Sequence, residues 1–269
     1  MNRRTPRPRR SFIFTPGLKP EMFPKALASG ADMVCIELED GIAPQDKADA
    51  RVCALKLFEE PQADDGVERI VRINSMRERF GIDDVQAVLE TNTPPPSLMM
   101  PKVRTPDEVK ILDQLLTERG HLTQLHVIIE TNEGLEAAHD IAHSSPRIEA
   151  LFFGGIDMAA ELRCKNGWDQ MLYARSRVVH AAASAGLDVI DVPYLDLADL
   201  DGMKILAQQA KDLGFAGKGS IHPKQIAPLN KIFTPSDEEI SRARRIIKTF
   251  EEAETGLVVI DGKLIEKPV

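Results

Sequence analysis

Short apolar runs alternate with longer stretches of helical periodicity along most of the chain. There are eight such runs, and most of them are almost continuously apolar rather than alternating, which is typical of parallel strands that are buried on both faces. The runs are Ser11–Thr15, Met33–Leu38, Arg69–Asn74, Ser97–Lys102, Leu125–Glu130, Ala150–Gly154, Leu187–Val192 and Ala216–Ile221. Between them the spacing of apolar residues predicts helices at Pro20–Ser29, Pro44–Phe58, Asp83–Glu90, Pro106–Arg119, Gly134–His143, Gln170–Ala185 and Asp199–Leu213.

This alternation of strands and helices predicts a parallel sheet with right-handed crossovers. Eight units with no linker between them favour closure into a barrel, and a length of 269 residues fits one such barrel. An open doubly wound sheet is the alternative, but Thr15-Pro-Gly-Leu after the first strand does not match the glycine-rich phosphate loop of that fold. We therefore predict an α/β fold, a (β/α)₈ TIM barrel with a short C-terminal helical and hairpin extension.

The extension is predicted from the last part of the chain. Pro235–Glu254 has the pattern of a long amphipathic helix with Ser236 as its N-cap. Apolar residues flank Asp261-Gly262, which is a strong signal for a hairpin turn. The predicted domains are a barrel with a basic N-terminal arm, residues 1–233, and a C-terminal helix with a terminal segment, residues 234–269.

Composition and charge narrow the class of protein. The chain is 43% hydrophobic and 28% charged, as is usual for a globular protein. A net charge of −8 argues against nucleic acid as the main partner, and no apolar run approaches the length needed to span a membrane. Three cysteines without C-x-x-C spacing fit a reducing compartment, so we expect a cytoplasmic protein. The arginines of the arm are expected either to be solvated or to contact phosphates, a substrate or another subunit; they are Arg3, Arg4, Arg7, Arg9 and Arg10.

In a TIM barrel the working residues follow the C-terminal ends of the strands, and ionisable residues follow seven of the eight strands here. Glu130 and Asp157 come from adjacent strands, so their carboxylates can converge on one ion. Two hard carboxylates with room for water and a substrate oxygen suit Mg²⁺. The alternative is that both are ordinary solvated or salt-bridged carboxylates. Glu133 competes with Glu130 because it lies in the same loop.

Arg72 is predicted to bind a substrate carboxylate, because a guanidinium pairs with a carboxylate through two hydrogen bonds. An ion pair with Glu39 or Asp40 on the neighbouring strand is the alternative reading of Arg72, and the two roles are compatible. Glu39 and Asp40 are also candidates to hold metal-bound water or to orient Arg72.

Several other residues at this rim have open roles. The Gly154-Gly155 pair allows close approach of backbone to a ligand, so Gly155, Ile156 and Asp157 are predicted to contact the substrate. Glu39 is a further candidate for substrate binding. Lys102 could bind phosphate or pair with Glu130. His222 could be a base or a capping residue before a proline, and the second is favoured. No G-x-S-x-G motif supports a serine hydrolase.

An ordered set of motifs resembles the citrate lyase β-subunit-like family of the HpcH/HpaI aldolase superfamily, whose relatives include the malyl-CoA and citramalyl-CoA lyases. The motifs are Arg10-Ser-Phe-Ile-Phe-Thr-Pro-Gly, Ile36-Glu-Leu-Glu-Asp-Gly-Ile-Ala-Pro, Val71-Arg-Ile-Asn, Ile129-Glu-Thr, Phe153-Gly-Gly-Ile-Asp-Met-Ala, Tyr173-Ala-Arg-Ser-Arg, Ser220-Ile-His-Pro and Phe233-Thr-Pro-Ser. They run in order from Arg10 towards the end of the chain, and the set is specific where one motif alone is not.

The resemblance implies Mg²⁺ held by Glu130 and Asp157, with Arg72 as the substrate clamp. It also implies a CoA thioester as substrate, a 2-keto acid as product, and a homotrimer or hexamer in which the C-terminal segment forms a lid shared between subunits. The family presents an aspartate on that lid, and Glu266 takes its place in this sequence. The longer side chain puts in doubt activities that need an acid at that position, such as thioester hydrolysis.

These observations predict a Mg²⁺-dependent carbon–carbon lyase that cleaves a citramalyl-CoA or malyl-CoA type substrate to a 2-keto acid and acetyl-CoA. Arg72, Glu266 and Asp40 are the candidate catalytic residues, and the sequence does not assign the base. One alternative is a citrate lyase β subunit that cleaves a carrier-bound citryl thioester to oxaloacetate. Another is a non-catalytic assembly subunit, which an intact set of Glu130, Asp157 and Arg72 argues against.

Overall fold

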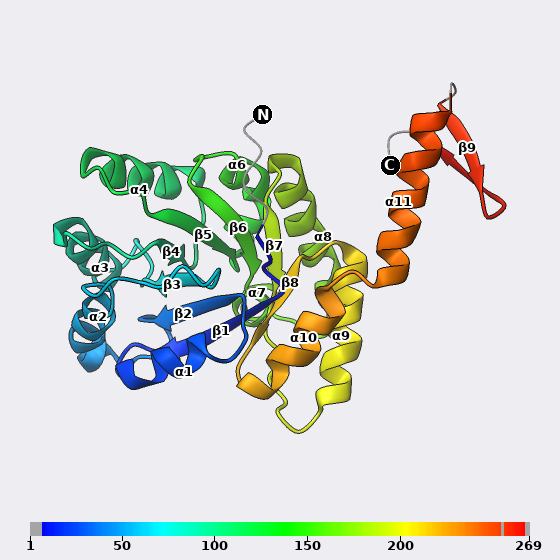
Figure 1. Cartoon of the computed structure of the whole chain (residues 1–269). Helices are drawn as coiled ribbons and strands as arrows, with labels where there is room; N and C mark the ends of the chain where they lie inside the picture. Colours follow the sequence, from blue (N-terminus) through cyan, green and yellow to red (C-terminus); the bar gives the residue numbers. More distant parts are fainter. Residues whose placement is uncertain (1–6, 254–255, 267–269) are drawn as a thin grey trace. The chain divides into compact units, whose positions relative to one another are not determined.

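Eight parallel strands form a closed barrel in chain order, and helices lie around its outside (Figure 1). The structure is a computed structural model that describes residues 7–253 and 256–266. The strands are β1 Ser11–Pro16, β2 Met33–Glu37, β3 Glu68–Arg72, β4 Ser97–Met100, β5 Gln124–Ile129, β6 Ile148–Phe153, β7 Asp188–Asp191 and β8 Gly217–Ser220. Each corresponds to one of the eight apolar runs, so the predicted TIM barrel is confirmed.

The helices of the barrel unit follow the strands as expected, with two additions. They are α1 Phe23–Leu27, α2 Lys47–Lys56, α3 Arg79–Glu90, α4 Pro106–Glu118, α5 Asn132–Glu136, α6 Ala138–Ala142, α7 Gly155–Leu162, α8 Trp168–Ala185, α9 Leu200–Leu213 and α10 Ile226–Phe233. Helices α7 and α10 were not predicted, because each is only eight residues long and α7 begins at a glycine. The predicted helix Gly134–His143 is split between α5 and α6.

The interior of the barrel is layered from one end to the other. A cluster of buried apolar side chains comes from strands alone and includes Ile70 and Ile128, so it fills the middle of the barrel. Residues two apart on a strand face the same side. Glu68 and Arg72 therefore lie below and above Ile70, and Glu130 lies above Ile128. The apolar layer separates charged groups at the two ends of the barrel.

In the described part of the N-terminal arm, Arg9 and Arg10 lie at the N-terminal ends of the strands and are paired with carboxylates. The Arg9 side chain is buried at the start of β1 and forms ion pairs with Glu68, Glu149 and Asp188 at 2.7–2.8 Å. Arg10 pairs with Asp32 at 2.8 Å. The expectation that these two arginines are solvated or meet a ligand is therefore wrong. Carboxylates at the N-terminal ends of the strands bind them, and Arg3 and Arg4 of the arm lie outside the described residues.

The chain divides into two compact units, Met1–Phe233 and Thr234–Val269. In the second unit, α11 Asp237–Glu252 begins at Ser236, whose side chain forms a capping box with Glu239. A hairpin of β9 Leu257–Ile260 and β10 Lys263–Glu266 follows, as predicted. Asp261 and Gly262 both have positive φ, 50° and 72°, as a two-residue type I′ turn requires. The predicted helix end at Glu254 lies outside the described residues.

In the described part of the chain no helix has both the length and the apolar character to cross a bilayer.

Candidate metal and substrate site

A cavity of about 360 Å³ opens at the C-terminal ends of the strands. Its polar lining includes Asp40, Arg72, Glu130, Asp157 and Asp191, and its remaining walls are mostly apolar. The rim of the barrel thus brings together most of the ionisable residues that the sequence places after strands.

Glu130 follows β5 directly and is 2% exposed. Its Oε1 accepts a hydrogen bond of 2.8 Å from the backbone N–H of Lys102. Burial, with the negative charges of Glu39 and Asp157 nearby, raises the pKa of Glu130 to about 8. A buried carboxylate next to two others is costly when ionised, so this position favours a bound cation.

Asp157 reaches the same cavity because β6 passes straight into α7. Gly154 is the N-cap of that helix and Asp157 lies in its first turn, where a negative side chain is favoured by the helix dipole. A Cβ on Gly154 would lie 2.3 Å from Oε2 of Glu130, so only glycine leaves room for the Glu130 side chain there. Ile156 is exposed, and it lines the cavity.

The carboxylates of this cavity fit a divalent cation that keeps part of its water. Among the described residues no three His, Cys, Asp or Glu side chains form a complete metal-binding group. Glu130 and Asp157 interact through their charges and both line the cavity. Mg²⁺ commonly binds proteins through one or two carboxylates and fills its other positions with water and substrate oxygens. Glu130 and Asp157 are therefore a donor set suited to it.

Arg72 ends β3 and points into the cavity, where two glutamates hold it. Its guanidinium pairs with Glu37 at 2.5 Å and with Glu39 at 3.0 Å. Its Cζ also lies 4.6 Å from the centre of the Phe14 ring. Burial disfavours the charge, but Glu37 and Glu39 outweigh it and raise the pKa of Arg72. Arg72 is a positioned cation, and its partners are Glu37 and Glu39.

Sequence reasoning missed Glu37. The register pairs Glu37 on β2 with Arg72 on β3, which places the two side chains next to each other on one face of the sheet. The alternation along Cys35-Ile-Glu could have indicated its position. Cys35 belongs to the apolar layer inside the barrel, and Glu37, two residues further along the strand, faces the same side.

Lys102 links both halves of the site. Its Nζ donates to Glu39 at 2.6 Å and to Asp40 at 2.9 Å, while its backbone N–H donates to Glu130. The pKa of Lys102 is raised, because the hydrogen bonds to Glu39 and Asp40 outweigh the effect of burial. Lys102 has a positive φ of 52°, an unusual conformation for a residue with a side chain. The expected ion pair of Lys102 with Glu130 is not formed, because its ammonium group pairs with Glu39 and Asp40 and only its backbone N–H contacts Glu130.

Other candidates lie outside this group. Glu133, the competitor of Glu130, is exposed and pairs with Arg104 at 3.5 Å. His222 is the N-cap of the 3₁₀ turn Pro223–Gln225, and its Nδ1 accepts from the N–H of Lys224 at 3.1 Å. Glu266 is exposed at the end of β10 in the second unit.

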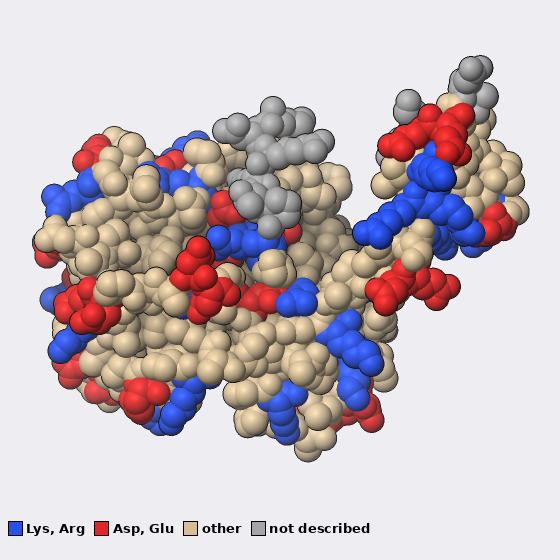
Figure 2. Space-filling model, in the orientation of Figure 1, with Lys and Arg blue, Asp and Glu red and all other residues tan. Residues whose placement is uncertain are grey.

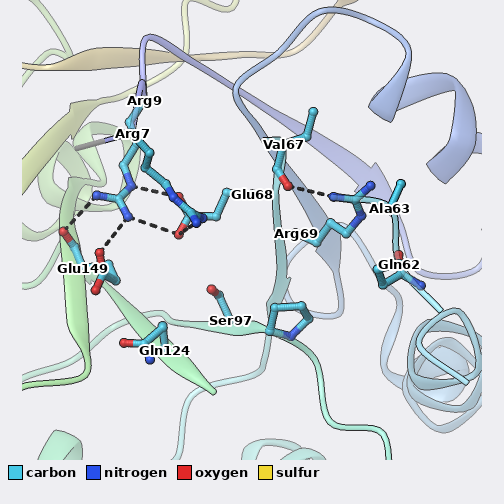
Figure 3. Close-up of a pocket in the computed structure, with 11 residues that line it drawn as sticks. Arg7, Arg9, Gln62, Ala63, Val67, Glu68, Arg69, Ser97, Gln124 and Glu149 are labelled. Carbon is cyan, nitrogen blue, oxygen red and sulfur yellow. Dashed lines mark hydrogen bonds and ion pairs between the residues drawn. The ribbon is translucent and has the colours of Figure 1, made fainter. Parts of the chain in front are cut away.

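A second cavity, of about 440 Å³, lies at the N-terminal ends of β3, β4 and β5 (Figure 3). Arg9, Glu68 and Glu149 come together on one side of it, joined by hydrogen bonds. Every charged group of this trio has a partner of opposite sign. In TIM barrels this end serves stability, so the candidate site is the cavity at the other end.

The surface carries both signs of charge. On the face of the barrel unit in Figure 2, Lys and Arg side chains are interspersed with Asp and Glu. On α11 basic side chains gather along one stretch, which contains Arg242, Arg244, Arg245 and Lys248.

Comparison with known proteins agrees with the motifs. Residues 10–223 match the HpcH/HpaI aldolase/citrate lyase family. The L-malyl-CoA/beta-methylmalyl-CoA lyase of Cereibacter sphaeroides is 33% identical, over 97% of this chain and 91% of that protein. The citrate lyase subunit beta of Escherichia coli K12 is 31% identical, over 100% of this chain and 92% of that protein.

Solved structures of similar sequence have the same fold as this chain. RipC from Yersinia pestis is 36% identical with a TM-score of 0.75, covering 86% of this chain and 97% of its own. CitE from Mycobacterium tuberculosis, in complex with magnesium, acetoacetate and coenzyme A, is 28% identical with a TM-score of 0.79, covering 96% of this chain and 92% of its own. The resemblance inferred from the motifs is confirmed.

Proposed function

Because the chain belongs to the HpcH/HpaI aldolase/citrate lyase family and is a carbon–carbon lyase, we propose that it uses Mg²⁺ to cleave a β-hydroxyacyl-CoA of the citramalyl-CoA or malyl-CoA type. The products are a 2-keto acid and acetyl-CoA. The observation that carries this proposal is the placement of buried Glu130, Asp157 and the guanidinium of Arg72 around one cavity.

Glu130 and Asp157 would hold Mg²⁺, which would supply Lewis-acid stabilisation of negative charge on the substrate oxygens. The use of this metal is supported by the magnesium complexes of the related CitE and by the fit of the two carboxylates to a hydrated divalent cation.

Arg72 binds the carboxylate at the far end of the acyl group. Glu37 and Glu39 restrict its guanidinium to one orientation, so little side-chain entropy is lost when the substrate binds. Gly154, Ile156 and Leu195 line the cavity and would form a wall for the thioester end, whereas the predicted contact residue Gly155 is buried and is not part of the lining.

Cleavage moves two protons. A base takes the proton of the β-hydroxyl, the carbon–carbon bond breaks, and its electron pair goes to the thioester fragment as an enolate. An acid then protonates that enolate to give acetyl-CoA. Asp40, at the rim and hydrogen-bonded to Lys102, and Glu266 on the C-terminal lid are the proposed proton carriers.

We propose that the C-terminal segment, residues 234–269, forms a lid over the active site. The chain then assembles into a homotrimer or hexamer, in which this lid is shared between subunits. Helix α11 has no buried residue within the described chain, and Leu257, Val259 and Leu264 of the hairpin are exposed. Apolar side chains exposed in this way favour a partner surface, here a second copy of the chain. Sedimentation velocity tests it, and a monomer at micromolar concentration would contradict it.

The deciding experiment incubates purified protein and Mg²⁺ with citramalyl-CoA, malyl-CoA or citryl-CoA and follows keto-acid release. Cleavage of citramalyl-CoA or malyl-CoA is expected. Release of oxaloacetate from citryl thioester alone would instead favour the citrate lyase β-subunit role, which the Escherichia coli relative brings into consideration. Lack of cleavage of all three would overturn the proposal.

Variants test the metal site separately. Glu130→Gln and Asp157→Asn are expected to lower kcat/KM by about 100-fold or more, since metal stabilisation is worth several kcal/mol. Glu133→Gln is the matched control, because Glu133 lies in the same loop but is exposed and pairs with Arg104. An active Glu130→Gln with unchanged Mg²⁺ affinity would exclude the metal assignment.

A further inference from the structure

A separate cavity of about 270 Å³ lies beside the candidate site, between the start of α8 and the segment that follows β7. We call it the side cavity. Val192, Pro193 and Leu195 line both the side cavity and the candidate site, so the two spaces are neighbours. Arg175 and Lys218 form part of the wall of the side cavity.

Arg175 and Lys218 belong to a buried cluster whose one anion, Asp191, lines the candidate site. Arg175 Nε donates to Asp191 Oδ1 at 2.9 Å, and Lys218 Nζ donates to Asp191 Oδ2. All three side chains are at most 3% exposed. Within the described residues, Arg175 and Lys218 pair with no other carboxylate. The cluster therefore has one more positive than negative group, in a place where water does not neutralise it.

This excess charge leaves unused hydrogen-bond donors. Nη1 of Arg175 is buried and has no hydrogen-bond partner among the described residues. Burial lowers the pKa of Lys218, and Arg175 adds to that effect while Asp191 opposes it. A buried N–H group without an acceptor lowers the stability of the folded protein, and so do two buried cations that share one carboxylate. Such groups in a native structure call for an explanation.

Two further features of the side cavity suit an anion. Gly167, the N-cap of the 18-residue helix α8, and Trp168, its first residue, line the cavity, and the helix dipole is positive at this end. The rings of Trp168 and Phe153 each lie 4.9 Å from Cζ of Arg175, and these contacts hold the guanidinium in place. The only carboxylate among the residues that line the side cavity is the exposed Asp196.

We propose that the side cavity binds a phosphate group, with Arg175 as its main ligand and Lys218 and the start of α8 supplying further positive charge. Guanidinium and helix N-termini are the usual phosphate-binding groups of proteins, and a tetrahedral oxyanion can accept from several directions at once. The phosphate is either inorganic phosphate or a phosphate of the thioester carrier. The second source rests on the proposed function, whereas the first does not.

Trp168 is the single tryptophan of the chain, so its fluorescence reports on the side cavity directly. Inorganic phosphate is titrated at constant ionic strength, held with chloride, into metal-free full-length protein. We expect a saturable change in Trp168 emission. A linear response that equals the response to chloride would overturn the proposal.

Two variants test the assignment of ligands. Arg175→Lys keeps the charge but loses the planar donor pair, and we expect phosphate affinity to fall about tenfold, or about 1.4 kcal/mol. Asn166→Asp adds a negative charge at an exposed lining residue, which leaves folding intact, and is expected to weaken binding by a similar factor. The matched control is Arg177→Met on the same helix, whose guanidinium contacts Leu135 and Glu136. Unchanged phosphate affinity in Asn166→Asp would overturn the proposal even if Arg175→Lys does not fold.

The source of the phosphate follows from competition. If CoA displaces inorganic phosphate and pantetheine does not, the carrier phosphate is the ligand. If CoA and phosphate bind together, the ligand is free phosphate, and the side cavity is then a separate anion site. Because the titration needs no turnover, failure of phosphate binding is distinguishable from failure of the lyase assay.

Discussion

The backbone N–H of Lys102 donates a 2.8 Å hydrogen bond to Oε1 of Glu130 while Lys102 has a φ of 52°. The left-handed conformation costs a residue with a Cβ about 1–2 kcal/mol. The strain is located where the chain leaves β4 and turns an N–H towards a buried carboxylate. Lys102 therefore has two roles: its backbone N–H, which every residue except proline possesses, donates to Glu130, and its side chain pairs with Glu39 and Asp40.

Substitution at Lys102 can separate these roles. Lys102→Gly and Lys102→Ala both keep the N–H and remove Nζ, but only glycine adopts positive φ without strain. We expect Lys102→Ala to be less stable than Lys102→Gly by about 1 kcal/mol in the free energy of unfolding by urea, and both to lose activity by a similar factor. Equal stability of the two variants would show that the conformation is not strained.

Removal of metal should expose the cost of ionised Glu130. Its folded-state pKa of about 8 is raised above the ordinary value of 4.5, so its contribution to stability is present below pH 4.5 and is lost as pH rises towards 8. Metal-free protein should therefore become less stable from pH 5 to pH 8, and saturating Mg²⁺ should reverse that trend. Thermal unfolding with EDTA or Mg²⁺ measures both effects.

Glu130→Gln is the informative variant in that experiment. The neutral side chain should give a metal-free protein whose melting temperature at pH 8 exceeds that of the parent, with little response to Mg²⁺. A parent-like increase in melting temperature with Mg²⁺ in this variant would contradict the assignment of Glu130 as a ligand.

Much of this site could be predicted because strand ends are easy to recognise. A near-continuous apolar run that stops at an acidic or basic residue locates the barrel rim, and Arg72, Glu130 and Asp157 were found in this way and line one cavity. The closed barrel itself follows from eight such runs with helices between them.

The ion pairs of the site and of the barrel ends could not be predicted, because they depend on strand register and burial, which cannot be read from one sequence. The pairing of Glu37 with Arg72 requires the alignment of β2 against β3, and the cluster of Asp191, Arg175 and Lys218 joins three separate elements. Arg9 was expected in a solvated or ligand-binding arm because a run of arginines at a terminus is usually exposed. Its carboxylate partners lie 59, 140 and 179 residues away in the sequence.

Gly154 is expected to tolerate no side chain. The Cβ of Gly154→Ala would lie 2.3 Å from Oε2 and 2.4 Å from Cβ of Glu130, so the glutamate must move. We expect at least a tenfold loss of Mg²⁺ affinity by titration calorimetry, comparable to the loss of a group that orients a ligand. Gly256→Ala is the control, since a Cβ there meets no atom of the described residues within 4 Å. Unchanged Mg²⁺ affinity in Gly154→Ala would argue against Glu130 as a ligand.

The ion cluster at the N-terminal end of the barrel should contribute stability without contributing to catalysis. Glu68 binds Arg9 at 2.8 Å and His126 at 2.9 Å, and all three side chains are buried. Glu68→Gln leaves Arg9 short of one partner, so we expect a loss of about 3 kcal/mol in the free energy of unfolding. Lys204→Met, which breaks an exposed pair with Asp201, should change it by about 0.5 kcal/mol or less.

The pH dependence of the same variant gives an independent check. Burial opposes ionisation of Glu68, but His126 and Arg9 outweigh it and hold the pKa of Glu68 far below its usual value of 4.5. A depressed folded-state pKa stabilises the protein above pH 4.5, and that stabilisation is lost as the pH falls towards the folded-state value. The stability difference between the parent and Glu68→Gln should therefore narrow progressively below pH 4.5 in urea unfolding. The apolar layer around Ile70 separates this cluster from Arg72, so kcat/KM of folded Glu68→Gln at pH 7 should stay within about twofold of the parent. A large fall in kcat/KM at unchanged fold would show instead that the two ends of the barrel are coupled through that layer.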